Sequence, residues 1–74
     1  MQYIVLIERG PTSWGAYVPD LPGCVAVGET REEVETLIRE ALPDHLAAMQ
    51  AHGETIPEPA TWAVTLDVAV PAGG

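Results

Sequence analysis

Lysine is absent from this sequence of 74 residues, and three arginines stand against 11 acidic residues, which gives a net charge of −8 at pH 7. Binding to nucleic acid needs cationic groups that displace counterions from phosphates. Three arginines spread along the chain cannot supply that field, so we expect no direct contact with nucleic acid. An acidic surface instead favours solubility and fast encounter with a basic protein.

Cysteine is nearly absent as well, because Cys24 is the single example. A single cysteine cannot form an internal disulfide, and no second thiol is present to complete a zinc knuckle. No apolar run approaches the roughly 20 residues of a membrane span, and the apolar N-terminus is too short for a secretory signal. We therefore expect a cytoplasmic protein without membrane contact. The chain is 47% hydrophobic, and a small domain without disulfides often gains stability by association. We therefore also expect a homo-oligomer.

The residues that could act in catalysis or bind a metal lack the neighbouring groups that such sites need. Cys24 and Ser13 have no adjacent histidine and no nucleophile elbow. His45 and His52 lie seven positions apart, whereas ligands on one helix usually lie three or four apart. We predict no catalytic residue, no cofactor and no metal site, and hence no enzyme. A metal-dependent nuclease, which needs several acids converging on a metal, is the least favoured alternative.

The N-terminal part of the chain predicts three short strands, over about residues 2–8, 14–18 and 24–27. β-Branched and aromatic residues enrich the first of them. The run Tyr17-Val-Pro-Asp-Leu-Pro-Gly-Cys24 lies between the second and the third. Its prolines fix φ and Gly23 tolerates a positive φ, so the run predicts a rigid turn in an antiparallel meander.

From Thr30 the apolar spacing becomes helical. One stripe recurs at helical intervals and consists of Val34, Leu37, Ile38, Ala41, Leu42, Leu46 and Met49. Thr30 and Glu33 have the pattern of a capping box, and Gly53 suits a helix end. These signals predict a helix over about residues 31–52. We expect a kink near Pro43, because the stripe keeps its phase on both sides; a second short helix that starts there is the alternative.

The C-terminal part alternates apolar residues with small or polar ones. The apolar positions are Trp62, Val64, Leu66, Val68 and Val70. They predict a last strand over 62–70 with one apolar face. A right-handed crossover would place this strand beside the first and parallel to it. We expect one α+β domain over residues 1–74, a four-stranded mixed sheet of order 3-2-1-4 with one helix on one face. The uncovered face would remain for a partner or a second copy.

Four segments carry a family resemblance: Tyr3-Ile-Val-Leu-Ile-Glu8, Trp14-Gly-Ala-Tyr-Val-Pro-Asp-Leu-Pro-Gly-Cys24, Gly28-Glu-Thr-Arg-Glu-Glu33 and Gly53-Glu-Thr-Ile-Pro-Glu-Pro59. Over about residues 3–70 the chain resembles the N-terminal domain of HicB-type antitoxins, in the short form without a DNA-binding domain. The resemblance implies a partly degraded RNase-H-like βββαβ fold. It also implies oligomerisation and neutralisation of a small, basic, RNA-cleaving toxin of the HicA type.

The candidate contact residues follow from this interpretation. For the toxin they are Asp20 and Leu21 on the rigid turn and Glu29 and Glu32 at the helix start, where the acids would face cationic groups. For self-association they are Trp14, Trp62 and Leu66, because aromatic and apolar side chains dominate interfaces. The alternative function is a stand-alone oligomeric module without a toxin partner.

Overall fold

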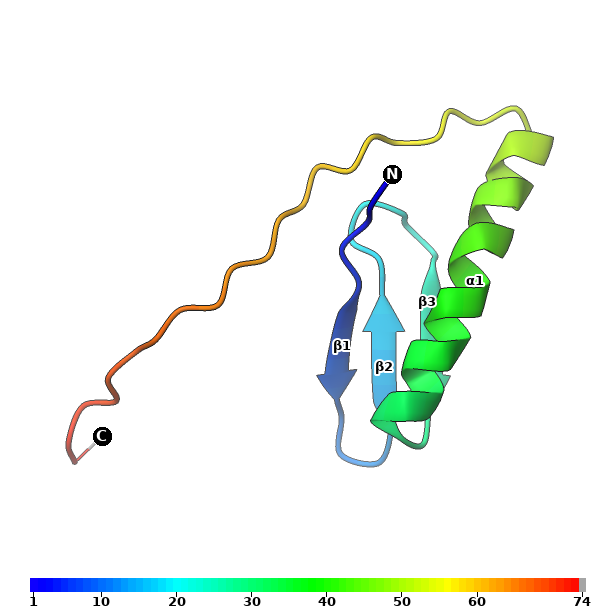
Figure 1. The fold of residues 1–74 in the computed structure, drawn as a ribbon. Coiled ribbons are helices and arrows are strands. Elements are labelled where there is room, and N and C mark those ends of the chain that lie inside the picture. The colour runs from blue at the N-terminus through cyan, green and yellow to red at the C-terminus, as the bar shows by residue number, and fades with distance from the viewer. Residues whose placement is uncertain (74) are drawn as a thin grey trace.

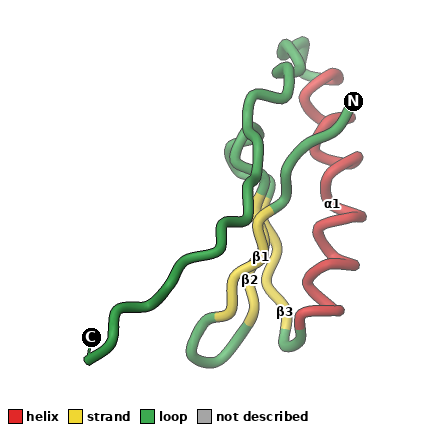
Figure 2. The backbone as a smooth tube through the Cα atoms, turned by 60° about the vertical axis from the view of Figure 1, so that its left-hand side comes forward, coloured by secondary structure: helices red, strands yellow, loops and turns green. Residues whose placement is uncertain are grey.

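The structure, a computed structural model, describes residues 1–73. Its elements follow in the order β1 (Leu6–Arg9), β2 (Trp14–Tyr17), β3 (Val25–Gly28) and α1 (Arg31–Ala51), as Figure 1 shows. The strand β2 pairs antiparallel with both β1 and β3, so the sheet has the order β1-β2-β3. The helix lies along one face of this sheet (Figure 2).

The predicted four-stranded sheet of order 3-2-1-4 is wrong. Within residues 1–73 the sheet has three strands, and 62–70 is not one of them, so the expected βββαβ order becomes βββα. The chain after α1 passes the N-terminus and extends away from the sheet on the β1 side (Figures 1 and 2). The radius of gyration is therefore 15.4 Å, against ~11 Å for a compact chain of this length. Alternation predicts an extended segment with an apolar face, but it does not determine which sheet edge that segment joins.

The register of the sheet separates its two faces. Ile7, Ala16 and Ala26 are aligned across the strands and pack into the core with the helix. Leu6, Tyr17 and Val25 form the next aligned row. Because successive strand residues point to opposite faces, this row lies on the face away from α1. It is 36%, 37% and 61% exposed, so the outer face of the sheet is apolar and uncovered.

Local signals at both ends explain the bounds of α1. The Thr30 hydroxyl accepts a hydrogen bond of 3.0 Å from the backbone N–H of Glu33, as an N-cap residue should. At the other end Gly53 has φ +72°, and the N–H groups of Gly53 and Glu54 donate to the carbonyls of Gln50 and Met49. This pair of bonds is a Schellman motif. The helix runs through Pro43 as a single element.

The turn between β2 and β3 contributes to the core. Leu21 N–H donates to the Val18 carbonyl, and Cys24 N–H donates to the Leu21 carbonyl, so two tight turns follow each other. Gly23 has φ +86°, the conformation that the third position of a type II turn requires. The folded turn places Leu21 inside the protein. The buried core consists of Ala16, Val18, Leu21, Cys24, Val34 and Ile38.

Candidate partner-binding surfaces

Acidic side chains gather at and after the start of α1. Six of the 11 acids lie within residues 29–44, together with two arginines, which leaves this stretch with a net charge of −4. Arg39 pairs with Glu35 at 2.9 Å. Glu29 and Glu32 are exposed, and the partial positive charge of the helix N-terminus favours carboxylates there. The first turn of α1 therefore presents negative charge to solvent, as a surface for a cationic partner requires.

The two turn residues predicted to contact a toxin have contacts inside the chain. Leu21 is only 1% exposed and belongs to the core. The Asp20 carboxylate accepts hydrogen bonds from the Ala60 backbone N–H at 3.0 Å and from the Thr61 hydroxyl at 2.8 Å. These two hydrogen bonds, of which the one from Ala60 has the larger effect, hold the pKa of Asp20 below its ordinary value. Toxin contact by these two residues stays a prediction, and Glu29 and Glu32 are the more accessible pair.

The connector after α1 is fastened at one end of the sheet. The Tyr3 hydroxyl donates to the Pro57 carbonyl oxygen, and Asp20 holds Ala60 and Thr61. Tyr3 precedes β1 and Asp20 follows β2, so both attachments lie at the same end of this antiparallel pair. No local pattern in the sequence predicts the Asp20 contact, because its partners are 40 and 41 residues away.

Residues 62–70, called the C-terminal segment from here on, follow this attachment. The large apolar side chains along the segment are all exposed: Trp62 85%, Val64 78%, Leu66 72%, Val68 77% and Val70 85%. Of the residues predicted for self-association, Trp62 and Leu66 thus lie on an uncovered extended chain. The third, Trp14, is partly buried and packs against the core. Self-association through these residues stays a prediction.

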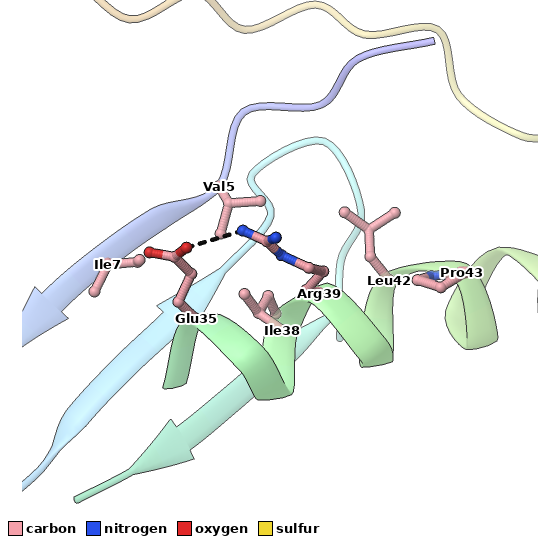
Figure 3. A pocket seen from close by; sticks show the side chains of 7 residues that line it. All are labelled: Val5, Ile7, Glu35, Ile38, Arg39, Leu42 and Pro43. Carbon is pink, nitrogen blue, oxygen red and sulfur yellow. Dashed lines mark hydrogen bonds and ion pairs between the residues drawn. The ribbon is translucent and has the colours of Figure 1, made fainter. Parts of the chain in front are cut away.

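A groove runs between β1 and α1, and its volume is about 390 Å³. The helix packs more extensively on β3 and β2 than on β1, so the inner side of β1 is incompletely covered. The groove is lined by Val5, Ile7, Glu35, Ile38, Arg39, Leu42 and Pro43, and Figure 3 shows these side chains. Its walls are aliphatic, and the charges of Glu35 and Arg39 are paired with each other. We call it the β1–α1 groove.

The described part of the chain does not bring metal-ligating side chains together. Across residues 1–73, no three histidine, cysteine or acidic side chains stand together in a group that could hold a metal ion. Burial raises the pKa of the Cys24 thiol, which disfavours the reactive thiolate. The Nδ1 atom of His52 lies 2.7 Å from the Ala48 carbonyl oxygen. The described residues also contain no helix of the length and apolarity that a membrane crossing needs.

Comparison with known proteins identifies the family. Residues 3–69 match the family described as the HicB-like antitoxins of bacterial toxin–antitoxin systems. The match covers most of the chain, and the chain belongs to this family. The predicted resemblance to HicB-type antitoxins is confirmed.

Three relatives illustrate the similarity. A UPF0150 protein of Thermoplasma acidophilum is 34% identical over 58 residues, which are 77% of this chain and 84% of that protein. Antitoxin HicB 2 of Photorhabdus laumondii is 33% identical over 61 residues, 82% of this chain and 44% of the relative. A 14.9 kDa protein of Haemophilus phage HP1 is 33% identical over 58 residues, 78% of this chain and 44% of the relative. The chain thus spans less than half the length of two of these relatives. No solved structure matches the chain significantly.

Proposed function

We propose that this chain is an antitoxin that neutralises a small, basic, RNA-cleaving toxin of the HicA type by direct protein contact. Membership of the HicB-like antitoxin family, through residues 3–69, is the observation that carries the proposal. The net charge of −8 supports it, since opposite net charges accelerate the encounter of two proteins.

The acidic start of α1 suits a partner that cleaves RNA. Such a toxin must present cationic groups to the phosphates of its substrate. Carboxylates at the N-terminal end of α1 are complementary to the same groups, and Glu29, just before the N-cap, and Glu32, in the first turn, are both exposed. An antitoxin bound through these carboxylates competes with RNA for the cationic surface of the toxin. Exposed charges of this kind contribute more to the association rate than to the affinity.

Co-expression with a small basic protein encoded beside this chain tests the proposal. The complex is purified through a tag on one protein, and RNA cleavage is measured before and after the partner is separated. Cleavage that starts only after separation supports the antitoxin function. If no partner co-purifies and the chain alone forms a defined oligomer, the antitoxin function is rejected in favour of a stand-alone oligomeric module.

Charge reversal tests the proposed contact residues. Changing Glu29→Lys and Glu32→Lys together should slow association with the toxin about tenfold at low salt and flatten its dependence on salt, because rim charges act mainly on the association rate. Changing Glu54→Lys and Glu58→Lys together is the matched control, since both are exposed and the change in net charge is identical. Equal rates for the two double variants, measured by stopped flow, would place the contact elsewhere.

A further inference from the structure

The C-terminal segment has the properties of a strand without a neighbour. Its nine residues, 62–70, alternate in polarity and span about 30 Å when extended. Every large apolar side chain of its apolar face is at least 72% exposed. Extended apolar chains of this kind readily add to an open sheet edge. The segment therefore needs a sheet edge and an apolar surface beside it.

The strand β1 offers both. Within residues 1–73, β1 pairs with β2 on one side, and its other side is an open edge of the sheet. The β1–α1 groove lies beside this strand, with Ile7 on its β1 wall and Leu42 on its α1 wall. Both side chains are only partly buried. An added strand would cover them and would complete the layer that α1 leaves open.

The fastening of the connector directs the segment away from its own sheet. Pro57 is held by Tyr3, and Ala60 and Thr61 are held by Asp20. From this attachment the chain diverges from β1, and two views 60° apart show the separation (Figures 1 and 2). The segment thus starts close to the sheet but extends towards solvent, where a neighbouring molecule can receive it.

We propose that the C-terminal segment of one copy adds to the β1 edge of a second copy and buries its apolar face in the β1–α1 groove there. A second copy carries both the segment and the groove, so the exchange is reciprocal and closes as a two-fold dimer in which the β1 edge of each copy is paired. This inference goes beyond the antitoxin function and does not depend on it. The sheet of each isolated chain remains three-stranded.

The chemistry of the groove favours this occupant over a basic toxin. The walls are aliphatic, and Arg39 already neutralises Glu35 at 2.9 Å. A cationic surface finds no free counter-charge on these walls. The apolar face of the segment instead consists of Trp62, Val64, Leu66, Val68 and Val70, with no charged residue among them. The proposed contact therefore joins two apolar surfaces.

A pair of single substitutions tests the exchange. Leu66→Asp places a charge on the apolar face, whereas Thr65→Asp places the same charge on the opposite face one position away. Light scattering after size-exclusion chromatography should give about twice the chain mass of 7.9 kDa for the wild type and for Thr65→Asp. The Leu66→Asp protein should dissociate with a dissociation constant at least tenfold higher. Both variants should retain the helical circular dichroism, since neither position touches the core.

A mixed dimer identifies the contact itself. Labelled and unlabelled chains are unfolded, mixed and refolded, and isotope-filtered NOEs between copies are recorded. Cross-peaks from the Leu66 methyl groups to Ile7 and Leu42 of the other copy are the expected result. A monomer at millimolar concentration would overturn the proposal. So would cross-peaks confined to one chain, or a dimer whose contacts lie on the outer face at Val25.

Discussion

The substitution Leu21→Ala tests the role of the turn between β2 and β3 most directly. Leu21 follows Asp20 in a run bounded by two prolines, which is an environment typical of an exposed loop. In the structure its side chain is 1% exposed, and with Val34 it is one of the largest fully buried side chains among the described residues. If the turn forms part of the core, truncation at Leu21 must reduce the stability of the whole domain.

The expected loss follows from the cost of a cavity. Replacing a buried leucine with alanine costs about 2–5 kcal/mol, and a domain of this size draws only about 3–5 kcal/mol from its core. A loss of about 3 kcal/mol lowers the ratio of folded to unfolded protein roughly 150-fold. With a urea m-value of about 1 kcal/mol/M, the unfolding midpoint should fall by about 3 M. The variant would then be partly unfolded without denaturant.

Urea unfolding followed by the helical circular dichroism measures this shift. Both proteins are compared at one chain concentration, because association would couple the midpoint to concentration. Val27→Ala is the control: Val27 is an aliphatic β3 residue that is 67% exposed, so its truncation should change stability by less than about 0.5 kcal/mol. A Leu21→Ala midpoint within 0.5 M of the wild type, a limit of about 0.5 kcal/mol at the same m-value, would refute the reasoning and would make Leu21 a surface residue.

Two further predictions concern single hydrogen-bonding groups. Thr30→Ala should destabilise the protein by about 1 kcal/mol in urea unfolding, because α1 loses its cap. Thr30→Ser keeps the hydroxyl and should restore most of the lost stability. Equal unfolding midpoints for the two variants would contradict a capping role for the hydroxyl. The Asp20 carboxylate should titrate with a pKa below the ordinary value of 3.8. Its stabilisation is complete above that value and is lost as the pH falls through the lowered pKa, so the Ala60 amide signal in NMR should shift over the same acidic range. A shift centred at or above 3.8 would mean that the carboxylate is not bonded to the connector.

Local signals sufficed where an element is specified by its own residues. The helix was predicted over about 31–52 and is observed over Arg31–Ala51, because Thr30, the apolar stripe and Gly53 act within one or two turns of the chain. The first three strands were predicted over about 2–8, 14–18 and 24–27, from β-branched and aromatic residues and from the turn residues between the strands, and they are observed over Leu6–Arg9, Trp14–Tyr17 and Val25–Gly28. Each of these features depends on neighbours in the sequence.

Non-local contacts could not be predicted. The alternation of residues 62–70 specifies an apolar face but not the edge that it meets, so the predicted fourth strand of the sheet was wrong. The turn residues Asp20 and Leu21 were selected as exposed contacts from their local composition. Their surroundings depend on Ala60 and Thr61, 40 and 41 positions from Asp20, and on the packing of α1 over the turn.

Adjacent residues of the turn have separate tasks. Leu21 contributes to the core, whereas Asp20 binds the connector and so sets the direction in which the C-terminal segment leaves the sheet. The stability of the domain and the direction of its C-terminal segment thus depend on two adjacent residues and can vary independently. A chain that keeps the leucine but loses the carboxylate would remain folded, while its tail would sample many directions and meet a neighbouring sheet edge less often. The hydrogen bonds of Asp20 restrict the orientation of the C-terminal segment before a partner binds, and this lowers the entropic cost of assembly.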